Sequence, residues 1–323
     1  MKTRDNLTEN SGSSRSIPVK LDKYGSLVRL KDPYDAPDPA SACETEREAI
    51  VDNLLTHLKS ESVSGQSCLD PSKVRFSYLE KRRMLQELLT VRRPDPLPSG
   101  FHEQLDRLLQ REVQDRGVID SASLPRIAQT SAATSYGASD RCALWRGDIT
   151  TLRIDAIVNA ANAYLLGCFQ PFHACIDNVI HAAAGPRLRD DCHAIMELQG
   201  GIEHTGRAKV TRAYNLPCRY VLHTVGPILH SVAQGPSPEQ AEQLAACYLS
   251  CLDLAAIVSN IRSVAFCCIS TGVFGFPQEP AARIALRTVE HWLDTHPGTL
   301  DLVVFNVFRL DDLRIYERLL NDG

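Results

Sequence analysis

The chain has 323 residues, of which 44% are hydrophobic and 23% charged, a mixture typical of a globular protein with its own core. Its formal net charge of −4 gives no overall attraction to nucleic acid or to an anionic membrane. No apolar run approaches the ~20 residues that cross a bilayer, and the N-terminus carries no hydrophobic signal segment, so we expect a cytoplasmic protein with reduced thiols.

The first part of the chain predicts helix and coil without a convincing strand. Residues 1–70 are expected to form a polar, partly disordered arm, mobile or loosely docked, in which only 44–60 carries a helical stripe of apolar side chains. Residues 71–139 predict a helical extension. Its helices are expected near 77–91 and 101–113, on either side of the sequence RRPDPLP, whose prolines disfavour helix.

Residues 140–323 predict an α/β domain, since short apolar strands alternate with helices. The expected strands are CALW, AIVNA, AKVTRA, YVLHTV, SVAFCCIS and LVVFNVF, and the expected helices lie near 174–184, 186–199, 238–258, 279–293 and 311–320. Strands that are apolar at nearly every position indicate a sheet covered on both faces. Such sheets bind ligands at the carboxyl ends of their strands, so we expect the chemistry there.

Three motifs at these strand ends have the character of ligand-binding loops. In WRGDIT, Asp148 can accept a hydrogen bond from an exocyclic amine or cap the following turn. In VNAAN, Asn162 can face sugar hydroxyls or stabilise a turn. In STGVFGFP, at 270–277, glycines expose backbone N–H groups suited to a diphosphate, and the lysine of a P-loop is missing.

A fourth motif carries metal-ligand chemistry. Cys168, His173 and Cys175 form the pattern C-x₄-H-x-C, and thiolate and imidazole are ligands that zinc prefers. Three protein ligands describe a catalytic site left open for water or substrate. Cys192 or His193 could instead close the site as a structural one.

Asp177 follows the last of these ligands by two residues, at the start of an expected helix. A carboxylate there can simply be favoured by the helix dipole, or it can act as a general base that positions water. His181, one helical turn later, is expected to pack against Asp177 or hold it.

Taken in order, these pieces resemble the macrodomain family of ADP-ribose binders and hydrolases. The resemblance rests on GDIT, DAIVNAAN, LLG, IDNVIHAAAG, TGRAKVTRAYNLP, YVLHTVGP and ISTGVFGFP, within residues 145–277. It implies a three-layer α/β/α macrodomain with a central mixed, largely parallel sheet. The C-x₄-H-x-C insertion and the helical preface LEKRRMLQELLTVRRPDPLPSGFHEQLDRLLQ resemble the zinc-containing branch found beside microbial sirtuins.

The resemblance also implies a role for each matching residue. Asp148 and the Ile149 backbone would recognise the adenine, Phe308 would lie against it, and Asn162 would contact the distal ribose and assist catalysis. The diphosphate would be wrapped by Ser270, Thr271, Gly272, Val273 and Phe274. Asp177 falls where related hydrolases carry their catalytic aspartate, and Cys168, His173 and Cys175 would hold Zn²⁺.

The implied function is a zinc-dependent hydrolase that removes mono-ADP-ribose from modified proteins by cleaving the C1″ linkage of the distal ribose. Its product would be ADP-ribose, and a sirtuin-type ADP-ribosyltransferase would be a functional partner. Zinc would orient the ribose and either polarise the departing group or lower the pKa of bound water to ~7. Two alternatives stay open: a non-catalytic reader of ADP-ribosylated proteins, and a hydrolase of small derivatives such as O-acetyl-ADP-ribose.

Overall fold

The computed structural model describes residues 19–39, 43–62, 76–131, 134–229 and 235–321. A six-stranded sheet in the order β2-β8-β7-β4-β6-β5 forms its centre, and only β5 runs antiparallel to its neighbour. The strands are β2 (Cys142–Arg146), β4 (Ala156–Ala161), β5 (Ala208–Arg212), β6 (Tyr220–Val225), β7 (Ser263–Phe266) and β8 (Leu302–Val307). β6 and β8 are buried at every position, which confirms a mixed, largely parallel sheet covered on both faces.

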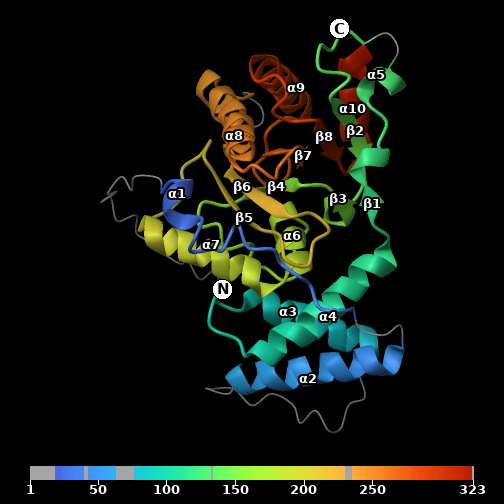
Figure 1. Cartoon of the computed structure of the whole chain (residues 1–323), viewed down its shortest axis with the longest axis vertical. Helices are drawn as coiled ribbons and strands as arrows, with labels where there is room; N and C mark the ends of the chain where they lie inside the picture. The colour runs from blue at the N-terminus through green and yellow to red at the C-terminus, as the bar shows by residue number, and fades with distance from the viewer. Residues whose placement is uncertain (1–18, 40–42, 63–75, 132–133, 230–234, 322–323) are drawn as a thin grey trace, which may run out of the picture.

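Helices cover the two faces of this sheet and complete the predicted three-layer fold (Figure 1). In that view α8 and α9 lie above the sheet, with α10 beside β2, and α6 and α7 lie below it. These helices are α6 (Ile176–Ala184), α7 (Pro186–Gln199), α8 (Pro238–Ile257), α9 (Gln278–Thr295) and α10 (Leu310–Asn321). α8 begins at a capping box of Ser237 and Gln240, as the sequence predicts.

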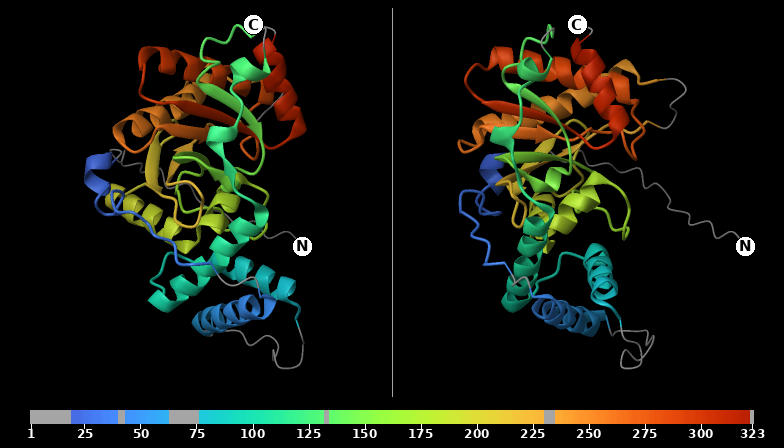
Figure 2. Two further views of the ribbon diagram at one scale, coloured as in Figure 1. Left: turned by 45° about the vertical axis from the view of Figure 1, so that its right-hand side comes forward. Right: turned by 90° about the vertical axis from the view of Figure 1, so that its right-hand side faces the viewer.

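Three further helices form the extension, at the opposite end of the molecule from α9 (Figures 1 and 2). They are α2 (Glu44–Ser62), α3 (Tyr78–Val91) and α4 (Ser99–Arg116). Apolar side chains of these helices, including Leu54, Leu85 and Leu105, form a core separate from that of the sheet domain. α3 and α4 also contact α6, so the extension lies against the lower helix layer.

The short elements between these helices and strands are the ones that the sequence does not predict. They are α1 (Leu21–Tyr24), β1 (Ile119–Asp120), η2 (Ser121–Ser123), α5 (Ile127–Thr130), η3 (Ile149–Thr151) and β3 (Leu152–Arg153). β1 and β3 pair as a parallel two-residue ladder. The expectation of no strand before 125 was therefore wrong, and the reason is that two exposed residues create no apolar period.

Part of the expected polar arm is packed on the sheet domain. Tyr24, Val28 and Leu30 are buried within the main core, and the backbone N–H of Val210 donates to the Tyr24 hydroxyl at 3.0 Å. A one-turn helix carries too few residues to show a period, which is why the sequence pattern did not reveal this docking. Residues 1–18, 40–42 and 63–70 of the arm lie outside the described residues.

None of the helices in the described part of the chain is both long enough and apolar enough to span a lipid bilayer.

Candidate functional site

A cavity of about 630 Å³ lies at the carboxyl ends of β4, β7 and β8, where the sequence places the chemistry. Ala160 and Asn162 line it after β4, Cys267 and Cys268 after β7, and Phe308 after β8. Most of the predicted site residues meet in this one cavity. They are Asn162, Cys168, His173, Cys175, Asp177, Ser270, Thr271, Gly272, Val273, Phe274 and Phe308.

Asp148 and Ile149 are not among the residues that line the cavity. Asp148 instead caps the short helix η3, with Oδ1 accepting from the Thr150 N–H at 2.9 Å and from the Thr150 hydroxyl at 2.7 Å. Its other oxygen, Oδ2, accepts from Arg116 of α4 at 3.0 Å. The structure thus shows the capping interpretation, and it adds a partner from the extension that sequence reasoning missed.

The predicted metal ligands come together in the loop between β4 and α6. Cys168 Sγ lies 3.3 Å from His173 Nδ1, and donor atoms of Cys168, His173 and Cys175 all lie within 4.8 Å of one another. Zinc binds thiolate sulfur at about 2.3 Å and imidazole nitrogen at about 2.0–2.1 Å, so a tetrahedral site separates the two donors by about 3.5 Å. The spacing and the chemistry of these donors therefore fit a zinc ion.

Cys192 and His193, the alternative fourth ligands, do not belong to this cluster among the described residues. Cys192 lies in a second, fully buried group with His181 and His223, beneath the cavity. His193 Nδ1 is 4.0 Å from Glu197 on the same helix. Among the described residues, the cluster in the loop thus offers three candidate ligands.

The first turn of α6 holds the loop in place. The Asn178 side-chain amide donates to the carbonyls of Gln170 and His173 at 3.3 and 3.1 Å, and its backbone N–H donates to Cys175 Sγ at 3.4 Å. Burial, reinforced by the neighbouring Cys168, raises the pKa of the Cys175 thiol to about 11. A thiol in such surroundings needs a nearby cation before it ionises at neutral pH.

Asp177 is 5% exposed and lies at the floor of the cavity. Its Oδ1 accepts from Asn159 Nδ2 at 2.8 Å, and its Oδ2 accepts from Asn162 Nδ2 at 3.3 Å. Burial raises the pKa of this carboxyl group to about 6, although the Asn159 hydrogen bond and the positive charge of Arg189 act in the opposite direction. Asp177 is therefore a desolvated carboxylate that two amides orient.

Sequence reasoning missed two buried residues behind Asp177, namely Asn159 and His223. Asn159, within the VNAAN motif, contacts His223 Nδ1 through its amide at 3.2 Å, and His181 Nε2 lies 3.5 Å from Asp177 Oδ1. Burial lowers the pKa of His223 to about 3, and burial also lowers the pKa of His181 well below its usual value. Both imidazoles are therefore neutral, and His181 packs beside Asp177 as the sequence predicts. The signal for Asn159 was that it is the one polar residue within the otherwise apolar strand β4.

The glycine-containing loop after β7 turns sharply beside the cavity. Ser270 adopts φ = 64°, and the loop is closed by bonds from Phe276 N to Ser270 O at 2.9 Å and from Gly275 N to Gly272 O at 3.1 Å. Gly226 lies so close that a Cβ at this position would be 2.0 Å from Ser270 Oγ. Backbone N–H groups in such a turn form a concavity that suits an anion.

Exposed apolar side chains surround the opening of the cavity. Phe308 is 74% exposed and Val273 and Tyr164 are each 65% exposed, and all three line the cavity. A concave site with apolar walls and a few convergent polar groups is typical of a small-ligand site. Tyr164 was not among the predicted site residues, because it follows the VNAAN motif without a pattern of its own.

Comparison with known proteins gives consistent matches. Residues 158–285 match the family described as Macro domain. The chain is 45% identical over 242 residues to a protein of Treponema medium named protein-ADP-ribose hydrolase, covering 75% of this chain and 88% of that protein. It is 55% identical over 274 residues to a protein of the same name from Staphylococcus aureus strain Mu50, covering 85% and 96%. Among solved structures, it resembles the Trypanosoma brucei macrodomain in complex with ADP-ribose, with a TM-score of 0.54, 32% identity and coverage of 72% and 94%.

Proposed function

The chain belongs to the macrodomain family, and from this premise we propose that it is a zinc-dependent hydrolase that removes mono-ADP-ribose from modified proteins. One observation carries the proposal. The Cys168, His173 and Cys175 donors and the buried Asp177 carboxylate line the same cavity as the glycine-containing loop. A nucleotide-binding region and a reactive centre are thereby combined in one site.

ADP-ribose would bind along the carboxyl ends of the strands. Phe308 would lie against the adenine, with Asp148 and the Ile149 backbone as its polar partners. Asp148 already accepts from Arg116, but a carboxylate offers about four acceptor positions and can take a further donor. The loop Ser270–Phe274 would bind the diphosphate through its backbone N–H groups, and Asn162 would contact the distal ribose.

The reaction would be hydrolysis at C1″ of the distal ribose. A zinc ion held by Cys168, His173 and Cys175 supplies a Lewis acid when bound. Asp177 would accept a proton from the attacking water, whose oxygen forms the new bond to C1″ while the bond from C1″ to the side-chain oxygen of the modified protein breaks. The electron pair of the broken bond would go to that side-chain oxygen, which would then take up the proton from Asp177. Because Asn159 and Asn162 each donate to one oxygen of Asp177, the carboxylate is held in one orientation for this transfer.

Single substitutions test this proposal. Cys168→Ala and His173→Ala should abolish release of ADP-ribose from a mono-ADP-ribosylated protein, while the Kd for ADP-ribose changes by less than about 3-fold, because the adenine and diphosphate contacts are elsewhere. Asp177→Ala should slow release by about 10² to 10⁴. Cys43→Ala, at an exposed cysteine, is the matched control and should behave as wild type.

Two other functions predict different results in the same assay. A non-catalytic reader would bind ADP-ribose without releasing it, yet a reader needs no buried carboxylate beside a Cys/His cluster. A hydrolase of small derivatives would cleave O-acetyl-ADP-ribose far faster than the modified protein. A sirtuin-type ADP-ribosyltransferase is the proposed source of the modified substrate. Wild-type activity in the Cys168 and His173 variants would refute the role of zinc.

A further inference from the structure

The loop of residues 162–175, between β4 and α6, carries the three candidate ligands and is called the metal-ligand loop below. Arg189, on α7, lies between this loop and the extension and is 6% exposed. Its Nη1 donates to the carbonyls of Leu89 and Arg92 at 3.0 and 2.5 Å. These carbonyls are at the C-terminal end of α3, where a helix leaves its last C=O groups without intrahelical partners. A cation is also favoured at this end of the helix dipole. Arg189 thus caps a helix of the extension from the sheet domain.

The same guanidinium contacts residues on both sides of Cys168 in the chain. Its Nε donates to the carbonyl of Leu166 at 2.8 Å, two residues before the ligand. Its central carbon lies 4.6 Å from the centre of the Phe169 ring, one residue after it. Cation–π and charge-assisted contacts of a buried arginine fix the positions of both partners.

An arginine of the extension itself also contacts the loop. Arg83 of α3 lies over the ring of Phe172, 4.5 Å from its centre, and Phe172 immediately precedes the ligand His173. The extension is therefore linked to the loop next to two of the three candidate ligands, directly through Arg83 and indirectly through Arg189 of α7.

The backbone of this loop requires such support. Leu165 and Phe172 both lie in the left-handed region, with φ of 60° and 58°. A residue with a side chain in this region is strained, and the conformation persists where surrounding contacts determine it. Both strained residues are next to groups that Arg189 or Arg83 contacts.

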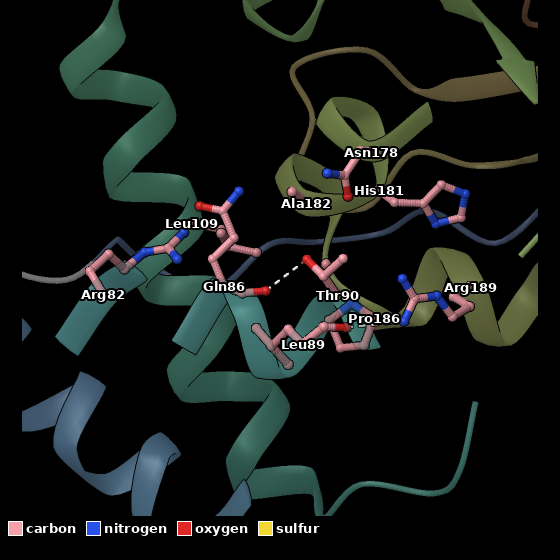
Figure 3. A pocket seen from close by; sticks show the side chains of 11 residues that line it. Arg82, Gln86, Leu89, Thr90, Leu109, Asn178, His181, Ala182, Pro186 and Arg189 are labelled. Carbon is pink, nitrogen blue, oxygen red and sulfur yellow. Dashed lines mark hydrogen bonds between the residues drawn. The ribbon is translucent and has the colours of Figure 1, made fainter. Parts of the chain in front are cut away.

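Apolar packing between the extension and the lower helix layer is incomplete at this point. A small cavity of about 30 Å³ lies between α3, α4, α6 and α7, and polar side chains, among them Gln86, Thr90 and Arg189, line it together with apolar ones. In Figure 3 the guanidinium of Arg189 points back toward the end of α3, where Leu89 and Thr90 lie. The contact between the extension and the lower helix layer at this point therefore includes directed polar contacts as well as apolar packing.

We propose that Arg189 is a positioning residue that uses the end of α3 as an anchor to hold the Cys168–Cys175 loop in its metal-binding shape. The part of the proposal that concerns zinc affinity rests on the proposed function, whereas the ordering of the loop does not. The helical extension then contributes to the metal site, because its contacts outside the sheet domain stabilise the loop that carries the candidate ligands.

The test compares Arg189→Met with Arg187→Met. Arg187 is the matched control, since it lies on the same helix and also joins the extension, through Asp106 of α4. It further donates to the Tyr34 hydroxyl of the N-terminal arm, and its side-chain contacts among the described residues do not include the loop. Two measurements are made on the full chain. One is the Kd for zinc, from competition between zinc chloride and a chelator. The other is hydrogen exchange of the loop amides in metal-free protein.

In Arg189→Met we expect zinc Kd to rise by about 10- to 100-fold and exchange across 166–175 to accelerate by about 10-fold. Arg187→Met should leave both values within about 3-fold of wild type. This should hold even if its melting temperature falls by as much as that of Arg189→Met. Arg189→Lys should recover only part of the effect, because an ammonium lacks the planar fork that reaches several carbonyls and stacks on a ring.

Arg83→Met provides a second variant at an exposed position, should Arg189→Met fail to fold, and it should accelerate exchange around Phe172. Equal changes in the Arg189 and Arg187 variants would overturn the proposal, as would unchanged exchange in both the Arg189 and Arg83 variants. If wild-type protein bound no zinc but Arg189→Met still lost protection of the loop, the proposed function would fail and the positioning role would stand.

Discussion

Asp191 shows how burial sets the energetics of a single ionisable side chain. It lies on α7 and accepts a hydrogen bond from the Tyr214 hydroxyl at 2.5 Å. Burial raises the pKa of its carboxyl group from 3.8 to about 6, in spite of this bond and of the nearby Arg212. The folded protein therefore keeps a proton on Asp191 at pH values where the unfolded chain has already lost it.

Stability should depend on pH at this residue in a defined direction. Between pH ~4 and ~6 the folded state binds the additional proton, so wild type loses stability as pH rises, by about 1 to 3 kcal/mol in total. Asp191→Asn keeps an acceptor for Tyr214 and removes the titration. In urea unfolding at pH 4 and at pH 8, the free energy of unfolding of Asp191→Asn should increase relative to that of wild type at the higher pH. An identical difference at both pH values would contradict this account.

Residues whose function depends on local spacing could be predicted from the sequence. Cys168, His173 and Cys175 fall within eight residues, so any compact loop brings them close together, and the structure does so. Arg189 could not be predicted, because its partners at Leu89 and Arg92 are about a hundred residues away along the chain. Asp148 carried both of its interpretations in one motif, and the structure shows its capping contacts together with an ion pair to Arg116.

At the scale of elements, the loop after β7 depends on close approach to the end of β6. A Cβ on Gly226 would lie 2.0 Å from Ser270 Oγ and 3.0 Å from Ile269 Cγ2. Gly272, in the same loop, has no atom within 4 Å of its hypothetical Cβ, yet it lines the cavity. Substitution of Gly226 therefore tests the shape of the loop, whereas substitution of Gly272 tests its contact with a ligand.

Gly226→Ala should displace the loop, because both Ser270 and Ile269 must shift. We expect a loss of about 1–3 kcal/mol in stability together with weaker ADP-ribose binding. Gly272→Ala should keep the wild-type melting temperature and weaken only the binding. Thermal unfolding and calorimetric titration with ADP-ribose measure both effects. A wild-type melting temperature in Gly226→Ala would show that the loop does not depend on this approach.

Helices and strands of ordinary length were predictable because caps and apolar periods mark them. α3 begins after the capping box of Ser77 and Glu80, close to the expected boundary. α1, β1 and β3 were not predictable, since elements of two to four residues carry too few side chains for a period. Their positions are set by contacts that are distant in sequence, such as the bond from Val210 to Tyr24.

At the scale of the whole molecule, the sheet domain and the extension each have a hydrophobic core, and both contribute residues around the candidate site. The sheet domain supplies the cavity, and the extension contacts the sheet domain through Arg116 at Asp148 and through Arg83 of α3 at the metal-ligand loop. Alternating strands and helices predicted the α/β fold. The docking of the extension was beyond prediction, because it depends on polar partners such as Asp106 and Asn215, which are 109 residues apart.

The central claim is that removal of ADP-ribose requires zinc bound by the loop. The most direct measurement is release of ADP-ribose from a mono-ADP-ribosylated protein before chelation, after removal of the metal, and after zinc is added back, with metal content measured at each step. We predict about one zinc per chain, loss of release on chelation, recovery with zinc, and ADP-ribose binding that persists throughout. Undiminished release from protein shown to be free of metal would contradict the account.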